Sequence, residues 1–305
     1  MGGHVSGHDD SGMLASGDRA APALPAATTV GRVTLQVSAL DRSVRFYETM
    51  LGFRVVERTG SRAVLGDAAA APLLELSVSE GVTAALPGSL GLYHFAVLLP
   101  DRAALGRLLR HLEDRAVRLG AADHLVSEAI YLHDLDGLGI EVYSDRPRAQ
   151  WTTRAGELAM ATEPLDFASL LAAAGSTAWD RLPAGAKIGH VHLHVGELAR
   201  ARAFYHEQLG LDITVARYPG ALFLSAGGYH HHLGVNTWAG PRAGPPPSSA
   251  ARLLHWELVV PGSDAARAAA TRLAAAGSPV AELIPDELWE VQDPWRTALR
   301  LKVAG

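Results

Sequence analysis

An internal duplication is the feature that most constrains the fold of this chain. Laid on itself, the sequence places GRVTLQVSALDRSVRFYETMLGF, from Gly31, over GHVHLHVGELARARAFYHEQLGL, from Gly189. Both segments alternate apolar and polar residues, as a strand with one buried face does, and then change to helical spacing through a Phe-Tyr pair. Each ends on Leu-Gly, which is a helix-stop signal. The chain is therefore predicted to contain a repeat that opens with a strand and a helix.

The same plan occurs twice more. LYHFAVLLPDRAALGRLLRHLEDRAV, from Leu92, and LLHWELVVPGSDAARAAATRLAAAGSPV, from Leu253, each read as a strand, a proline and an amphipathic helix. Four units therefore begin near residues 30, 91, 188 and 253, and we number them one to four. Each is long enough for a strand, a helix and three further strands, which predicts an α+β protein.

Composition shifts predict how the units are grouped. Residues 1–28 are rich in Gly, Ser, Ala and Asp and are expected to be a disordered tail. Residues 29–145 and 187–305 are expected to be two domains of two units each. The connector between them, 146–186, has one helical stretch, near Leu165 to Ala174.

Charge and cysteine content exclude several classes of function. The net charge of −5 provides no basic surface for nucleic acid or for an anionic membrane. The absence of cysteine excludes thiolate catalysis and thiolate metal sites, so a metal would need His, Asp or Glu. No segment resembles a secretion signal or a membrane span, and we expect a cytoplasmic protein. A homo-oligomer is common for such proteins, but no segment indicates an interface.

Histidines gather on one face of the strand at the start of unit three. In GHVHLHV the valines and the leucine can pack under the helix, because residues two apart share a face. The histidines then lie on the opposite, polar face; they are His190, His192 and His194. At the start of unit two, alternation places Tyr93, Phe95 and Val97 on one face and His94 on the other.

An acidic residue sits in the last strand of unit two. Glu141 lies between Ile140 and Val142, whose side chains point to the opposite face. A carboxylate in such a strand needs a partner, either a metal ion or a basic side chain, because burying it alone is costly. Together with two histidines it would form a His-His-carboxylate set, which is typical of mononuclear non-haem iron. Taken singly, each residue is more typical of an ordinary core or ion-paired position.

These segments resemble the vicinal oxygen chelate superfamily, and within it the type I extradiol dioxygenases, especially the catechol 2,3-dioxygenase branch. The resemblance rests on GHVHLHV, GLYHFAVLLP and SAGGYHHHLGVNTW and extends from residue 30 to about 303. It implies four βαβββ modules forming two domains, with curved mixed sheets and helices outside. It also implies that His190, His94 and Glu141 bind the metal.

The resemblance implies further roles around that metal. Tyr131 would hydrogen-bond the substrate or an intermediate, and His124 would orient it. Of the three consecutive histidines, His231 matches the acid-base residue and His232 is the competing candidate. Three further residues would line or shape the substrate pocket: His192, Asn236 and Trp238.

The ligand positions predict how the units pair. Joining units one and two would put Arg32 in place of one histidine, and joining three and four would put Arg300 in place of the glutamate. Pairing units two and three supplies a complete set, so we predict the active site there and a structural role for His255. The alternative is a three-histidine site made of His190, His231 and His255.

The leading hypothesis is cleavage of a catechol ring beside the diol, by Fe(II) and O2, to a muconic semialdehyde-type product. Mn(II) uses the same ligand types and is the alternative metal. A glyoxalase or isomerase using Ni, Zn, Mn or Co, and a metal-free binding protein of the antibiotic-sequestering kind, are the alternative functions. Under the leading hypothesis, the protein binds a small aromatic diol and O2.

Overall fold

Two eight-stranded mixed sheets make up most of the described chain, and the connector adds a two-stranded sheet. A computed structural model describes residues 23–305, and residues 1–22 of the predicted tail lie outside the described residues. The first sheet has the order β16-β17-β18-β15-β1-β4-β3-β2 and is built by units one and four. Its strands are β1 (Thr29–Val37), β2 (Arg54–Arg58), β3 (Arg62–Gly66), β4 (Pro72–Val78), β15 (Arg252–Val260), β16 (Val280–Ile284), β17 (Leu288–Gln292) and β18 (Ala298–Val303).

The second sheet is built by units two and three, in the order β12-β13-β14-β11-β5-β8-β7-β6. Its strands are β5 (Gly91–Leu98), β6 (Gly120–Asp123), β7 (Ser127–His133), β8 (Gly139–Asp145), β11 (Lys187–His194), β12 (Asp212–Val215), β13 (Ala221–Ser225) and β14 (Leu233–Asn236). The predicted α+β class and the four βαβββ modules are confirmed. The predicted pairing of units two and three is also confirmed, so each sheet takes one module from each half of the chain.

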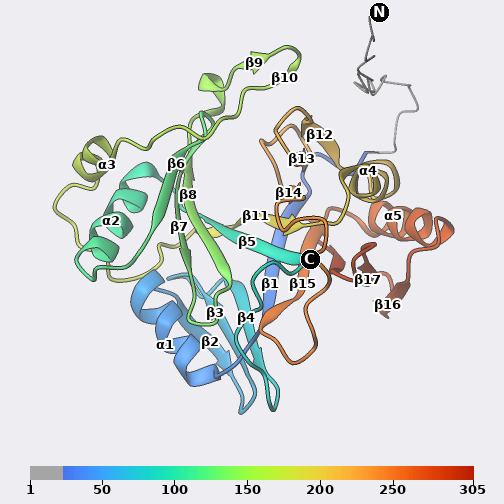
Figure 1. Cartoon of the computed structure of the whole chain (residues 1–305), viewed down its shortest axis with the longest axis horizontal. Coiled ribbons are helices and arrows are strands. Elements are labelled where there is room, and N and C mark those ends of the chain that lie inside the picture. Colours follow the sequence, from blue (N-terminus) through green and yellow to red (C-terminus); the bar gives the residue numbers. More distant parts are fainter. Residues whose placement is uncertain (1–22) are drawn as a thin grey trace, which may run out of the picture.

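One long helix follows the first strand of each module and lies at the periphery, while β5 and β11 cross the centre (Figure 1). The helix of unit three begins as α-helix and continues as π-helix. The helices are α1 (Leu40–Leu51), α2 (Arg102–Glu113), α4 (Leu198–Arg202) with η2 (Ala203–Gln208), and α5 (Ser263–Ala275). No helix among residues 23–305 is long and apolar enough to cross a membrane.

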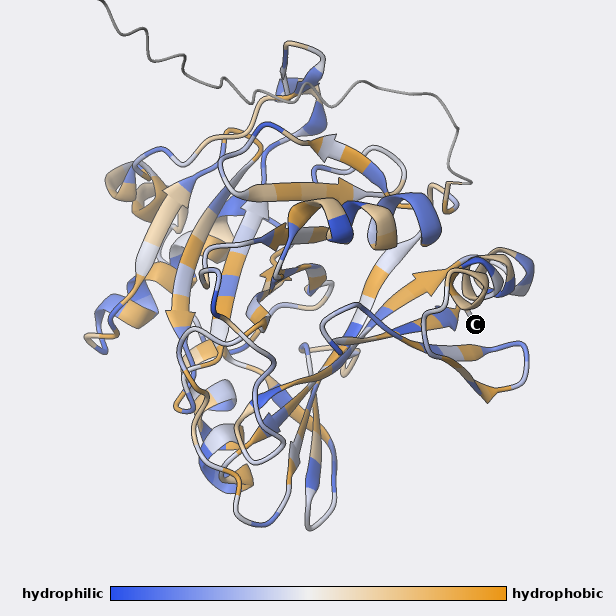
Figure 2. Ribbon diagram, turned by 45° about the vertical axis from the view of Figure 1, so that its right-hand side comes forward, coloured by the Kyte–Doolittle hydropathy of each residue, from blue (hydrophilic) through white to orange (hydrophobic). Residues whose placement is uncertain are grey.

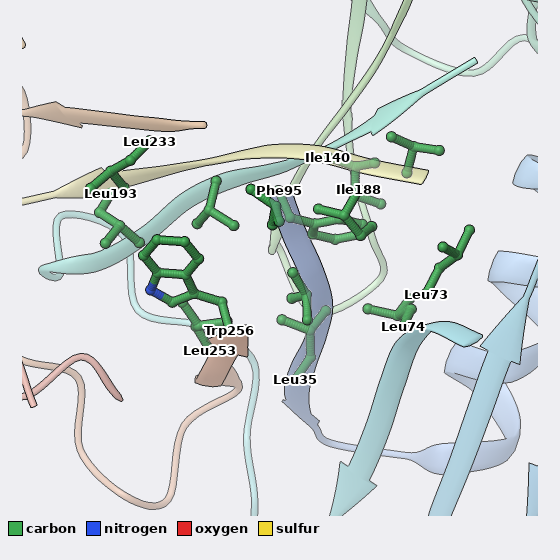
Figure 3. Close-up of a cluster of buried hydrophobic side chains, with 14 of the residues drawn as sticks. Leu35, Leu73, Leu74, Phe95, Ile140, Ile188, Leu193, Leu233, Leu253 and Trp256 are labelled. Carbon is green, nitrogen blue, oxygen red and sulfur yellow. The ribbon is translucent and has the colours of Figure 1, made fainter. Parts of the chain in front are cut away.

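The hydrophobic core lies where the two sheets meet. Alternating hydrophobic and hydrophilic bands run along the strands (Figure 2), as expected for strands with one buried face. Leu35 and Trp256 from the first sheet face Phe95 and Leu193 from the second (Figure 3), and all four are fully buried. This contact leaves the other face of the second sheet available for polar side chains.

Two segments expected to be outside the domains pack against them. Of the predicted tail 1–28, residues 23–28 are ordered against the protein, because Leu24 is buried and its backbone N–H donates to the Gly210 carbonyl at 2.8 Å. The expectation of disorder was therefore wrong for these residues. The connector holds η1 (Arg148–Gln150), β9 (Thr153–Arg154), β10 (Glu157–Leu158) and α3 (Phe167–Ala173), which confirms the predicted helix.

A buried tyrosine-aspartate hydrogen bond joins the two sheets within each half of the chain. The Tyr47 hydroxyl on α1 donates to Asp134 in the turn before β8, at 3.1 Å, and Tyr205 on η2 donates to Asp293 before β18, at 2.8 Å. Both tyrosines come from the duplicated Phe-Tyr pair. Burial raises the pKa of Asp134 to about 6, although hydrogen bonds from Leu138, Asp136 and Tyr47 oppose the shift.

We predict that Asp134→Asn changes the pH dependence of stability. A carboxyl with a raised folded pKa contributes stability that is fully present below its unfolded pKa of 3.8 and is lost as the pH rises through about 6. The amide does not titrate, so the unfolding free energy of the variant should gain about 2–3 kcal/mol relative to the parent between pH 4 and pH 7. Urea titrations across this range measure the difference. The exposed Asp180→Asn is the control, and a difference that does not vary with pH would contradict the prediction.

Candidate metal centre and active site

Three adjacent strands of the second sheet bring together the predicted metal ligands. β11, β5 and β8 are neighbours, and Ala96 on β5 is paired with His190 on one side and with Glu141 on the other. The small side chain of Ala96 leaves room between these two residues. His94 lies two residues earlier on the same face of β5. The sheet register therefore converges His94, Glu141 and His190 on one point.

Their ligand atoms are close together and shielded from solvent. Glu141 Oε2 lies 3.0 Å from His94 Nε2 and 3.1 Å from His190 Nε2. All three side chains are buried, and one donor atom of each lies within 4.8 Å of the others. His94 Nε2 is buried and, despite its short distance to Glu141, has no partner in hydrogen-bonding geometry.

The protonation states suit a divalent cation. Burial works to raise the pKa of Glu141, but His190 and His94 outweigh it and hold that pKa well below its usual range. Burial lowers the pKa of His190 to about 4, against the opposing attraction of Glu141. An ionised carboxylate and a neutral imidazole are the forms in which these side chains bind metal. The unpartnered His94 nitrogen and this donor set therefore fit a mononuclear metal held on one face, leaving other coordination positions open.

Tyr131 and His124 form a pair beside the ligands. His124 Nδ1 lies 2.7 Å from the Ala161 carbonyl, which can only accept, so Nδ1 carries the proton. With His124 in its neutral form, Nε2 accepts from the Tyr131 hydroxyl, 2.5 Å away. Burial, with Glu141 adding to it, raises the pKa of Tyr131 well above its usual value. Tyr131 thus stays a phenol whose proton points to His124.

The structure distinguishes among the three consecutive histidines. His231 lines the cavity next to the ligands, with its ring centroid 4.0 Å from that of His190. Its Nδ1 lies 2.7 Å from His230 Nδ1, and its Nε2 has no protein partner among the described residues. His232 does not line this cavity, and its Nδ1 accepts from the backbone N–H of Ala226 at 3.1 Å.

Of the residues expected to line or shape the pocket, two line the cavity and one lies behind it. His192 and Trp238 are in its wall, with ring centroids 5.5 Å apart. Asn236 is fully buried behind them and does not line the cavity. Its Nδ2 donates to His192 Nε2 at 2.9 Å, and its Oδ1 accepts from the Trp238 N–H at 3.0 Å. Asn236 positions the two lining residues.

Tyr93 is not on the face that alternation predicted. The pairing of β5 with β11 skips one residue between His94 and Leu92, which makes Tyr93 the extra residue of a β-bulge. A bulge reverses the alternation locally, so Tyr93 lies at the cavity wall. The centroids of the Tyr93 and His94 rings are 4.9 Å apart. Strict period-two reasoning could not detect this shift.

The connector supplies a wall that no motif revealed. Met160, Ala161 and Thr162 line the cavity, and Thr162 Oγ1 lies 2.7 Å from the hydroxyl of Tyr218, another lining residue. The connector is thus tied to unit two through His124 and to unit three through Tyr218. Only its position between the two halves of the sequence hinted at this role.

The cavity is small and largely apolar. Its volume is about 280 Å³, and Glu141 is its one acidic lining residue. The described part of its wall contains neither lysine nor arginine. Four aromatic side chains besides Tyr131 and the histidines line the cavity; they are Tyr93, Tyr218, Phe223 and Trp238.

The equivalent position in the first sheet holds ion pairs instead. Arg32, which matches His190, lies 3.2 Å from Glu75 and 3.6 Å from Glu257. His255 Nε2 accepts from Arg300 at 2.8 Å. The alternative three-histidine site is therefore wrong, because His255 belongs to the other sheet and its nitrogen is already bound by a guanidinium.

Comparisons with known proteins agree with this architecture. A family model described as the Glyoxalase/Bleomycin resistance protein/Dioxygenase superfamily matches residues 29–142 and 187–293. A catechol-2,3-dioxygenase of Bacillus subtilis (strain 168) is 42% identical over 271 residues, which are 88% of this chain and 94% of that protein. A solved structure of a proposed dioxygenase from Bacillus subtilis superposes with a TM-score of 0.63 at 14% identity, covering 90% of this chain and 84% of that chain. Glyoxalase I from Zea mays superposes with a TM-score of 0.53 at 16% identity, covering 90% and 92%.

We predict that metal binding depends on unit two and not on unit four. His94→Ala and Glu141→Ala should each weaken Fe(II) binding by at least about 100-fold, because each removes a ligand rather than an outer-shell partner. His255→Ala should bind Fe(II) as the parent does. Anaerobic titration with Fe(II), and with Mn(II) in parallel, measures this, and circular dichroism checks folding. Retention of iron by His94→Ala with its loss from His255→Ala would assign the site to the other sheet.

Proposed function

Because the chain belongs to the Glyoxalase/Bleomycin resistance protein/Dioxygenase superfamily, and is an extradiol dioxygenase-like enzyme within it, we propose that it cleaves a catechol ring beside the diol. The reaction would use Fe(II) and O2 and yield a muconic semialdehyde-type product, as a step in the breakdown of an aromatic compound. The observation that carries the proposal is the buried set of His94, Glu141 and His190 beside a cavity of single-ring size.

The two histidines and the glutamate would hold the metal through His94 Nε2, His190 Nε2 and the Glu141 carboxylate. Bound Fe(II) would supply Lewis acidity and open positions for the diol and for O2. The carboxylate offsets part of the cation's charge, and two neutral imidazoles complete the set. Burial of all three ligands would keep competing water away from the reacting atoms.

Two side chains would handle the hydroxyl protons of the substrate. His231 Nε2 is free of protein partners, and its place beside His190 puts it in reach of a diol bound at the ligands. It would accept a phenolic proton there and return it later, which is work suited to an imidazole. Tyr131, whose own proton goes to His124, would accept a hydrogen bond from the second hydroxyl.

The cavity wall favours an uncharged, single-ring catechol. A carboxylated ring would bury its anion in a cavity whose described lining has no lysine or arginine to pair with it. Burying an unpaired carboxylate is costly, whereas the aromatic wall of Tyr218, Phe223 and Trp238 suits an apolar ring. The size of the cavity, about 280 Å³, supports one ring rather than two.

The first experiment is oxygen uptake by anaerobically purified protein loaded with Fe(II). Catechol should give metal-dependent uptake and a yellow ring-fission product, and 3,4-dihydroxybenzoate should give a kcat/KM at least about tenfold lower because its carboxylate has no partner. Metal-free protein is the control. Protein that holds iron but consumes no oxygen with any catechol would favour a glyoxalase or isomerase, and protein that holds no metal would favour a binding protein.

A further inference from the structure

A histidine and an aspartate lie behind His231. His230 Nδ1 is 2.7 Å from His231 Nδ1, and His230 Nε2 is 3.0 Å from Asp145 Oδ1. The His230 side chain is completely buried, and Asp145 retains 26% of its side-chain exposure. The three groups form a line from the cavity wall towards the surface, and it crosses from unit three to unit two.

The positions of the protons follow from what each group can donate. A carboxylate only accepts, so His230 carries a proton on Nε2. With His230 in its neutral form, Nδ1 is an acceptor, and His231 then donates from its own Nδ1 across the 2.7 Å contact. His231 Nε2 is thereby left without a proton. This is the nitrogen that has no protein partner.

We propose that His230 and Asp145 are positioning residues that hold His231 in the Nδ1–H form, with Nε2 ready to accept a proton from the substrate. This inference rests on the proposed function, because it concerns the same base. These two residues, the His230–Asp145 dyad, act through His231 and do not contact substrate. An orienting group behind an imidazole sets both its tautomer and its rotation, and the chemistry depends on both.

The surroundings of the dyad are built to hold it. Asp145 follows Glu141 on β8 by four residues, so one face of one strand carries both a metal ligand and the anchor of the dyad. The Tyr229 hydroxyl also donates to Asp145, at 3.0 Å, and lies 2.7 Å from the Tyr143 hydroxyl, which must donate to it. The Tyr143 hydroxyl occupies the space where a Cβ of residue 189 would come within 1.8 Å, which explains a glycine before His190.

The tautomers can be measured directly in metal-free protein labelled with ¹⁵N-histidine. Long-range ¹H–¹⁵N correlation spectra should show His230 as the Nε2–H form and His231 as the Nδ1–H form, assigned with His230→Phe and His231→Phe. Removing the acceptor in Asp145→Leu should abolish the fixed pattern at both rings. A His231 that carries its proton on Nε2 in the parent protein would overturn the proposal, whatever the enzyme's activity.

Kinetics test whether the dyad matters to the base. His230→Phe keeps a ring at this position but removes the Nδ1 acceptor. We expect kcat to fall roughly tenfold to hundredfold, which is part of the contribution of a general base. KM should change less than about twofold. His230→Asn can place an oxygen near the position of Nδ1 and should recover much of the loss. His111→Phe, on the outer helix α2, is the matched control.

Iron content separates this test from that of the function itself. All the His230 variants should bind Fe(II) as the parent does, because His230 is not a ligand. A full kcat in His230→Phe, or a His230→Asn no better than His230→Phe, would overturn the dyad while leaving the dioxygenase proposal intact. A parent enzyme without oxygen uptake would instead end the functional proposal, and the spectra would still decide the tautomers.

Discussion

The antiparallel pairing of β5 with β11 is the contact on which the site depends. It joins the first strand of unit two to the first strand of unit three and sets His190 opposite Ala96, with Glu141 on the other side of that alanine. His94 and Glu141 come from the first half of the chain and His190 from the second, so neither half holds all three ligands. The duplication therefore provides the strands, but the ligand set forms only because modules from the two halves pair in one sheet. The tyrosine-aspartate hydrogen bonds then tie the modules of each half to each other across the two sheets.

The two sheets show two ways to place charge at one position of a repeated scaffold. In the first, Arg32 lies between Glu75 and Glu257. Arg62 also pairs with Glu75 and Lys302 with Glu257, so basic side chains balance both carboxylates. In the second, Glu141 faces His94 and His190; burial lowers the pKa of His190 to about 4, so that imidazole does not neutralise the carboxylate. A buried carboxylate without a full partner is costly, and a cation bound there would remove that cost. The first sheet therefore balances its buried carboxylates with its own basic side chains, whereas the second leaves a carboxylate that a cation could balance.

Sequence reasoning predicted the features that repeat. Alternation and the Phe-Tyr helix gave the four modules, and the missing ligands at Arg32 and Arg300 gave their pairing. It failed where a β-bulge interrupts the alternation of a strand and where a residue contacts a segment far along the chain. Tyr93 turns to the cavity because of a bulge, Met160 reaches it from a connector without a motif, and Leu24 is buried by a partner far along the chain. The choice of His231 over His232 also needed coordinates, because adjacent residues outside a regular strand have no fixed faces.

The most direct test of the account is anomalous diffraction at the iron edge from crystals grown anaerobically with Fe(II). One strong peak is expected within coordination distance of His94 Nε2, His190 Nε2 and the Glu141 carboxylate, and none beside His255. A peak in the first sheet, or an iron-loaded crystal with no peak at the His94, Glu141 and His190 set, would contradict it.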